Sequence, residues 1–318
     1  MAESKLSHTY RMENHKKIIT KSFFLICLLL CSATYAFDER SDGWLPINSE
    51  NGTLVLNVKI NGHPANILLD TGASIHTLSS SIAEKTGIKG NSARAITLIG
   101  VNGKVKAPLS APFDIVADGQ KFTLRDIPII EGNSSYGMIL GRDFFEQSVV
   151  QIDYPNNRIR FLSPEIVNFD SNIDVRYEYG GGLLVEAYIA GEKAWMLLDT
   201  GSNTLALLKR KFIFKNDLDQ YVLEGITHEV SGIAESAQFN VIKVEEFRLG
   251  TYDFDSFLAL YNQDYKNSFD EKKKYLFSRI PEESSIQDGI LGYDILRNFV
   301  VTIDYKRKKV HLYFPSAS

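Results

Sequence analysis

The chain has 318 residues, of which 44% are hydrophobic and 23% charged, and it carries a formal net charge of −4. This composition is typical of a soluble globular protein. The acidic balance excludes the basic surface by which most proteins bind nucleic acids. The six histidines are scattered without the spacing of metal ligands, so we expect no metal site and no cofactor.

Residues 1–36 have the three parts of a secretory signal peptide. Three lysines come first, an apolar run follows from residue 23 to residue 31, and small residues lead to an exit at Ala36. The run is shorter than the roughly 20 apolar residues that a membrane-spanning helix needs, which argues against an uncleaved anchor. A lipid anchor on Cys31 is another alternative, although Leu30 is larger than the residue that normally precedes a lipidated cysteine. We therefore expect an exported protein, periplasmic or secreted.

The part that remains after cleavage is long enough for two domains. It has 282 residues, with 30 basic and 37 acidic side chains and a formal charge of −7. Both cysteines lie in the signal segment, so the exported protein has no disulfide and depends on its hydrophobic cores. A chain of this length can bury two independent cores.

The chain contains an internal duplication. The stretch "LLDTGAS" at Leu68–Ser74 returns as "LLDTGSN" at Leu197–Asn203, 129 positions later. Before each motif, alternating apolar residues and a Gly-containing turn predict a β-hairpin. Near the end of each half, an apolar pair and a Gly precede a short helical stretch, a strand into Ile-Asp-Tyr, a turn and a closing strand. This repetition predicts two homologous lobes, residues 37–165 and residues 166–318.

Both lobes are predicted to be mainly β, because short strands and frequent Gly turns outnumber helical periodicities. We expect an all-β protein in which each lobe is a small β-barrel. A pseudo-twofold axis would relate the two lobes, with a cleft between them. The second repeat is longer, mostly because of a charged insertion at residues 262–288. A solvated loop is the simpler interpretation of this insertion, and a charged lid or partner surface is the alternative.

Two aspartates brought together on such an axis would form an acid–base pair. Asp70 and Asp199 each follow a buried apolar strand, so equivalent loops would place them face to face. Ionising both of two carboxyls that lie within a few ångströms costs free energy, so the pair shares one proton. Such a pair can take a proton from water and give one to a peptide carbonyl without a covalent intermediate.

The residues after each aspartate suit such a site. Thr71 and Thr200 offer short hydroxyls that can bond the backbone across the lobe interface. Gly72 and Gly201 let the backbone turn sharply and approach a neighbouring group closely. Each loop can therefore pack tightly against the other.

The two motifs differ directly after the glycine. Ser202 can donate a hydrogen bond to the Asp199 carboxylate and favour its charged form. Ala73 has no hydroxyl and cannot do the same for Asp70. We therefore predict that Asp70 holds the shared proton more often than Asp199.

The duplicated D-T-G-[AS] motif, with apolar-apolar-Gly near each lobe end, resembles the pepsin and retropepsin superfamily of aspartic proteases. The stretch "ILGYDILRNFVVTIDYKRKKVHL" from Ile290 is similar to the closing segment of pepsin-like lobes, and "ILGRDFF" from Ile139 is closer to retropepsins. The resemblance covers nearly all of residues 45–315. It implies an acid-protease-type fold in a single chain, like a fused retropepsin dimer of the kind found in bacteria.

By this resemblance, Asp70 and Asp199 are the catalytic dyad. The next three residues of each motif would form the active-site loops, with the two threonines interlocked beneath the dyad and the two glycines against the substrate backbone. These loop residues are Thr71, Gly72, Ala73, Thr200, Gly201 and Ser202.

Two segments are candidates for the hairpin flaps that cover substrate in this superfamily. They follow their aspartates at similar distances, and an ordinary surface hairpin is the alternative interpretation. The candidate flap residues are Ile99, Gly100 and Val101 in the first half, and Ser231, Gly232 and Ile233 in the second. Arg142 matches a retropepsin arginine that pairs with an acid near the dyad. The position of that acid is occupied by Ser74 here, so a surface arginine is the alternative.

Together these features predict an exported aspartic endopeptidase that acts as a monomer on extended peptide or protein substrates. Hydrolysis would use a water between Asp70 and Asp199. The alternative from another class is a catalytically weak peptide-binding or regulatory module on the same fold. A homodimer, in which lobes of two chains pair, is a third possibility.

Overall fold

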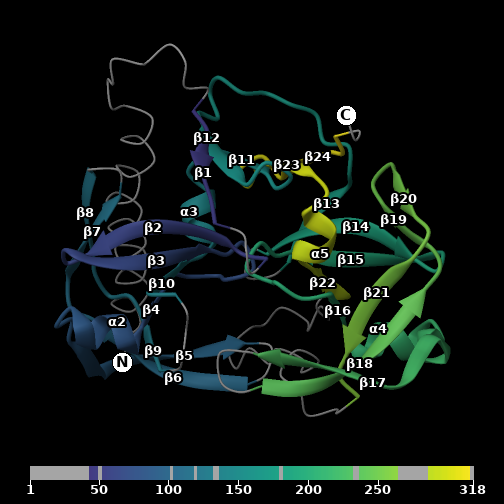
Figure 1. Cartoon of the computed structure of the whole chain (residues 1–318), viewed down its shortest axis with the longest axis horizontal. Coiled ribbons are helices and arrows are strands. Elements are labelled where there is room, and N and C mark those ends of the chain that lie inside the picture. The colour runs from purple at the N-terminus through teal and green to yellow at the C-terminus, as the bar shows by residue number, and fades with distance from the viewer. Residues whose placement is uncertain are drawn as a thin grey trace, which may run out of the picture.

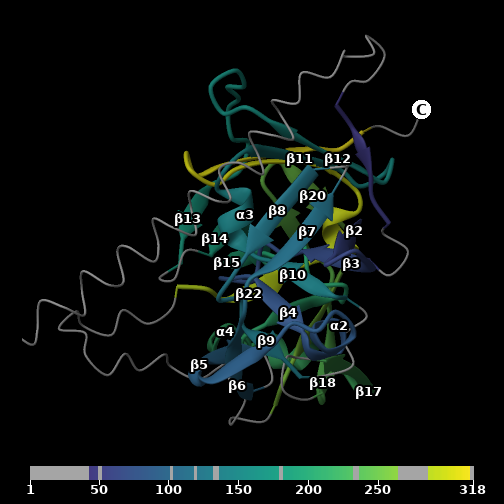
Figure 2. The same cartoon turned by 90° about the vertical axis from the view of Figure 1, so that its left-hand side faces the viewer.

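The structure is a computed structural model, and it describes residues 43–48, 52–100, 103–117, 120–131, 136–178, 182–231, 236–263 and 286–315. Strands dominate this part of the chain, and its helices are short (Figures 1 and 2). The prediction of a mainly β protein is therefore confirmed. The predicted signal peptide lies outside the described residues. Residues 264–285, which make up most of the charged insertion, also lie outside them.

A seven-stranded sheet contains the first D-T-G motif. Its strand order is β8-β7-β2-β3-β10-β4-β9. The strands are β2 (Leu54–Ile60), β3 (His63–Leu69), β4 (Thr77–Ser79), β7 (Phe113–Ala117), β8 (Gln120–Leu124), β9 (Ile129–Ile130) and β10 (Met138–Leu140). Helix α2 (Ser80–Lys85) follows β4 and is capped by Ser79, whose hydroxyl accepts the backbone N–H of Ile82 at 3.2 Å.

A ten-stranded sheet contains the second motif. Its main path is β17-β18-β21-β16-β22-β15-β14-β19-β20, and β13 pairs with β14 beside this path. The strands are β13 (Val175–Tyr177), β14 (Leu183–Ile189), β15 (Glu192–Leu198), β16 (Ala206–Leu208), β17 (Val222–Ser231), β18 (Ser236–Val244), β19 (Phe247–Leu249), β20 (Tyr252–Phe254), β21 (Phe257–Tyr261) and β22 (Gly289–Leu291). Helix α4 (Arg210–Lys215) and the 3-10 helix η1 (Leu218–Tyr221) precede β17. Within the described ranges, no helix has the length and apolar character to cross a membrane.

A third sheet joins the two halves of the chain and lies at the top of Figure 1. Its order is β1-β12-β11-β23-β24. The strands are β1 (Leu45–Pro46), β11 (Val149–Asp153), β12 (Arg158–Leu162), β23 (Val300–Asp304) and β24 (Lys309–Tyr313). At the centre of the antiparallel β11–β23 pair, Gln151 lies opposite its duplicate Thr302 and donates a side-chain hydrogen bond to it at 2.9 Å. The predicted lobe boundary after residue 165 falls between β12 and β13 and stays a prediction.

The hairpins before the two motifs have the same construction. Strands β2 and β3 turn at Asn61–Gly62, with φ of 44° and 82°, and β14 and β15 turn at Ala190–Gly191, with φ of 50° and 79°. Two successive residues with positive φ make the turn that matches the twist of a two-residue hairpin. Strand β10 then pairs in parallel with β3, and β22 pairs in parallel with β15. The two predicted hairpins are confirmed, while an overall pseudo-twofold axis stays a prediction.

The far ends of the two halves also repeat. Helix α3 (Arg142–Phe145) precedes β11, and helix α5 (Tyr293–Leu296) precedes β23. Each strand ends in a buried aspartate that holds the following turn. Asp153 accepts the backbone N–H of Asn156 at 3.3 Å, and Asp304 accepts that of Arg307 at 2.8 Å. The next residue in each half is a buried tyrosine, Tyr154 or Tyr305, and both lie close to the aspartate motifs.

The main hydrophobic core draws side chains from both halves. Leu69, Phe145, Leu198 and Tyr305 belong to this one cluster, and each is 1% exposed or less. Burying a large apolar side chain stabilises a fold by roughly 1.5–3 kcal/mol. Since β3 and β15 both end inside this core, the residues that follow them start from fixed positions.

Candidate active site

Each D-T-G loop leaves the end of a buried strand. The backbone N–H of Asp70 donates to the carbonyl of Leu140 on β10 at 3.0 Å, and that of Asp199 donates to Leu291 on β22 at 3.0 Å. Both aspartates are therefore tied to the strand that runs beside their own. The predicted pair of motifs occupies equivalent places in the two sheets.

The two loops are interlocked by their threonines. Thr71 donates its backbone N–H to the hydroxyl of Thr200 at 3.1 Å and its own hydroxyl to the carbonyl of Leu198 at 2.6 Å. Thr200 returns both bonds, to the Thr71 hydroxyl at 3.0 Å and the Leu69 carbonyl at 2.8 Å. Both threonines are 2% exposed or less. Four buried bonds across two segments far apart in sequence leave little freedom in how the loops meet.

The glycine of each loop lies against the carboxyl group of the other. A β-carbon on Gly72 would lie 2.6 Å from Oδ2 of Asp199, and one on Gly201 would lie 2.6 Å from Oδ2 of Asp70. Such distances are shorter than any van der Waals contact, so a β-carbon at either position would displace the opposite carboxyl group. The same relation brings the two carboxyl groups together.

Burial raises the pKa of both carboxyls. The pKa of Asp199 rises well above its ordinary range, because of burial first, then the charge of Asp70 and a hydrogen bond between the two carboxyls. The pKa of Asp70 rises because of burial, and hydrogen bonds from the Ala73 N–H, from Asp199 and from the Gly72 N–H oppose the rise. A buried pair that resists double ionisation holds one proton between its members.

The hydrogen bond on which we based the assignment of the shared proton to Asp70 is not formed in the described structure, so that assignment stays a prediction. In the described part of the chain, the Ser202 hydroxyl makes no bond to the Asp199 carboxylate and lies beside Gly292 instead. Backbone amides bind the carboxylates in both loops: Ala73 donates to Asp70 Oδ1 at 2.9 Å, and Gly201 donates to Asp199 Oδ1 at 2.9 Å. Burial raises the pKa of both carboxyls, and the charge of Asp70 adds to the rise at Asp199, which favours Asp199 as the alternative holder of the shared proton.

A buried tyrosine, which the sequence analysis did not single out, supports the first loop. The hydroxyl of Tyr305 donates to the carbonyl of Thr71 at 3.2 Å, and the ring is fully buried. Tyr154 is its duplicate in the first half and is 5% exposed, yet its hydroxyl has no hydrogen-bond partner in the described structure. The repeated Ile-Asp-Tyr was the available signal for both residues, but it does not distinguish them.

The difference between the tyrosines predicts opposite effects on stability. Y305F should lower the free energy of unfolding by about 1–2 kcal/mol, because it leaves the buried carbonyl of Thr71 without this donor. Y154F should leave the free energy unchanged or raise it slightly, since it removes a buried hydroxyl that makes no bond. Urea unfolding of the two variants and wild type measures this, and equal losses in both would contradict the assignment.

Arg142 is paired within its own helix. Its Nε donates to Glu146 Oε1 at 3.2 Å, and only 17% of its side chain is exposed. Its charge also opposes the rise in pKa that burial gives Tyr305, so the guanidinium lies near the base of the first loop. The retropepsin-like pairing with an acid just after the motif is absent among the described residues, because Ser74 stands at that position.

His76 is buried beside the first loop and stays neutral. Its Nδ1 accepts the backbone N–H of Gly141 at 3.0 Å, and burial lowers its pKa to about 4. The neutral ring therefore holds the turn into α3. No cluster of three or more His, Cys, Asp or Glu that can hold a metal ion occurs in the described ranges.

Two hairpins lie on the opposite side from the shared sheet, along the lower edge of Figures 1 and 2. The first is β5 (Gly90–Gly100) with β6 (Gly103–Ser110), and the second is β17 with β18. Ile99 and Gly100 lie at the end of β5, and Ser231 ends β17. The candidate flap residues Val101, Gly232 and Ile233 lie outside the described residues.

The flap candidates end in exposed side chains. Ile99 is 57% exposed although it is apolar, and the Ser231 hydroxyl lies 3.0 Å from that of Ser236 across the second hairpin. An apolar side chain at a hairpin tip is available for contact with a bound peptide. Their function as flaps stays a prediction.

A mainly β chain with two interlocked D-T-G loops defines the acid-protease-type class of proteins. In agreement, residues 56–147 match the family described as gag-polyprotein putative aspartyl protease. The match contains the first motif, the first candidate flap and α3, and it supports the place of the chain in the pepsin and retropepsin-like superfamily. No curated protein matches the chain at a significant level.

Proposed function

We propose that the chain is an aspartic endopeptidase, which hydrolyses peptide bonds with a water held between Asp70 and Asp199. The observation that carries the proposal is the reciprocal packing of each loop glycine on the opposite carboxyl group. It brings together two partly buried carboxyls whose pKa values are both raised by burial. An aspartyl protease family match over residues 56–147 supports the same general activity.

The chemistry would proceed by paired proton transfers. Ionised Asp70 takes a proton from the water, whose oxygen attacks the carbonyl carbon of the substrate, while protonated Asp199 gives its proton to the carbonyl oxygen. The resulting diol collapses when the amide nitrogen is protonated by Asp70 and the C–N bond breaks. Asp199 then recovers a proton from the diol, and both products leave as a free acid and a free amine.

The substrate would bind as an extended peptide between the candidate flaps and the dyad. Such a strand pairs through backbone hydrogen bonds, while pockets for its side chains give specificity. The proposal includes export through the predicted signal peptide to the periplasm or the medium, and action as a monomer. These parts rest on the sequence alone.

Proteolysis can be tested on the purified chain with a denatured protein mixture at pH values from about 4 to 7, the range in which a raised carboxyl pKa allows one shared proton. We expect cleavage that pepstatin inhibits and that disappears in both D70N and D199N. The control D219N changes an exposed aspartate and should cleave like wild type. Cleavage that persists in D70N and D199N contradicts the proposed dyad, and an absence of cleavage at every pH favours a peptide-binding module.

A further inference from the structure

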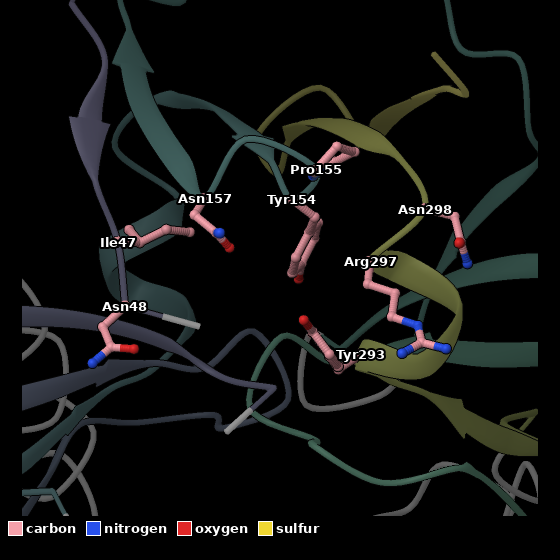
Figure 3. A pocket seen from close by; sticks show the side chains of 8 residues that line it. All are labelled: Ile47, Asn48, Tyr154, Pro155, Asn157, Tyr293, Arg297 and Asn298. Atoms are coloured by element: carbon pink, nitrogen blue, oxygen red, sulfur yellow. The ribbon is translucent and has the colours of Figure 1, made fainter. Parts of the chain in front are cut away.

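A second site lies where the two halves meet, close to the turn after β11. It is a pocket of about 670 Å³, lined by the chain beside β1, by the turn between β11 and β12, and by α5 with the residues that follow it (Figure 3). This volume falls in the range of roughly 300–1,000 Å³ that small-molecule sites occupy. None of the aspartate loop residues lines it, but the pocket lies near the dyad, because the charge of Asp199 adds to the rise in pKa that burial gives Tyr154.

Tyr154 supplies the pocket with a buried donor. Less than a tenth of the side chain is exposed, and its hydroxyl has no partner in the described structure. Figure 3 shows this hydroxyl directed into the pocket, toward the hydroxyl of Tyr293 on α5. The two rings meet edge to face, with their centres 5.9 Å apart. A buried hydroxyl without a partner costs free energy, which an acceptor on a ligand would recover.

Arg297 gives the pocket a positive charge. It is exposed, it directly follows α5, and it forms no ion pair among the described residues. No Asp or Glu lines the pocket. The equivalent place in the first half differs, because Glu146 stands at the position of Arg297 and pairs there with Arg142. In the first half this charge is therefore neutralised, whereas the pocket is lined by an arginine without an ion pair and a tyrosine hydroxyl without a partner among the described residues.

We propose that this pocket, here called the Tyr154 pocket, binds small carboxylic acids, including the C-terminal carboxylate of a short peptide. The ligand places its negative charge at Arg297 and offers an acceptor to the Tyr154 hydroxyl. Charge-assisted bonds to a guanidinium are among the strongest in proteins, so the carboxylate is the group that decides affinity. The proposal is independent of the proteolytic function.

Isothermal titration calorimetry tests the Tyr154 pocket on the D70N chain, in which peptides are not consumed. The probes are N-acetyl-trialanine, its C-terminal amide, and succinate, each titrated in the presence of pepstatin so that the cleft is filled. We expect the acid form of the peptide to bind at least about tenfold more tightly than the amide. Binding of the tripeptide alone identifies a peptide carboxylate as the ligand, whereas binding of succinate alone identifies a free organic acid.

Three substitutions assign the binding to the pocket. R297Q and Y154F should each weaken the binding of the acid by about five- to tenfold, because each removes one donor without creating a cavity. R94Q is the matched control, since Arg94 is a surface arginine paired with Asp126 and does not line the pocket. Equal affinity for acid and amide, an unchanged affinity in R297Q, or no saturable binding of either acid at millimolar concentration would overturn the proposal. If pepstatin does not bind, this counts against the endopeptidase proposal. The comparison of R297Q, Y154F and R94Q still tests whether the Tyr154 pocket binds carboxylates.

Discussion

G201A should reduce the rate of peptide hydrolysis by about 100-fold or more, while the chain stays folded. An added β-carbon on Gly201 would lie 2.6 Å from Oδ2 of Asp70, so the carboxyl must move away from the water that it shares with Asp199. Displacement of a reacting group by about 1 Å is enough for a loss of this size. G72A should have the same effect through the carboxyl of Asp199. Steady-state cleavage of a peptide substrate, with circular dichroism to confirm folding, measures both.

The control for these variants is G191A. Gly191 has a φ of 79° in the turn between β14 and β15, and an added β-carbon there meets no atom within 4 Å. Alanine in this conformation costs about 1–2 kcal/mol of stability. Its rate of hydrolysis should nevertheless equal that of wild type. If G201A and G72A keep more than half of the wild-type rate, the carboxyls do not lie against the opposite glycines.

D199N should abolish hydrolysis and at the same time stabilise the fold at neutral pH, by about 1–3 kcal/mol. Burial raises the pKa of Asp199 well above its value in the unfolded chain. The folded wild type therefore keeps a proton that the unfolded chain releases, and its stability falls as pH rises through the folded pKa. An amide is neutral at every pH and escapes this loss. The gain should appear as pH rises above about 4 and vanish near pH 3, where both forms are neutral.

Thermal unfolding of wild type and D199N across this pH range measures the effect. D304N is a control of opposite sign, because the buried Asp304 accepts the backbone N–H of Arg307 at 2.8 Å and its guanidinium at 3.1 Å. Loss of these charge-assisted bonds should lower the stability at pH 7. A D199N variant that is destabilised equally at pH 3 and pH 7 would show that the carboxyl is not held in its neutral form.

Much of the fold could be predicted because its signals are local. Alternating apolar residues and two Gly turns predict the hairpins before Asp70 and Asp199, and those hairpins depend only on residues within a few positions. The pairing of the two motifs followed from the duplication itself. Short-range patterns of this kind can be recognised from the sequence alone.

The electrostatics of the site could not be predicted in the same way. The proton assignment relied on the hydroxyl of Ser202, whereas the carboxylates are bound by backbone amides, which every residue carries and no side-chain pattern reveals. Tyr154 and Tyr305 likewise both follow the repeated Ile-Asp, which does not distinguish them. Their hydroxyls differ in the structure, because that of Tyr305 reaches the carbonyl of Thr71, whereas that of Tyr154 has no partner in the described structure. Such differences arise only from contacts between distant segments.

The shared sheet determines how the site comes together. Strands β11 and β23 pair within a single polypeptide, and the loops that carry Asp70 and Asp199 are covalently connected by the chain between them, which includes β11. A linked pair of segments meets at an effective concentration in the millimolar range, set by the connecting chain and not by the amount of protein present. Two separate lobes would instead obey a bimolecular equilibrium and come apart on dilution. If the chain acts as a monomer, as we propose, assembly of the site does not depend on protein concentration.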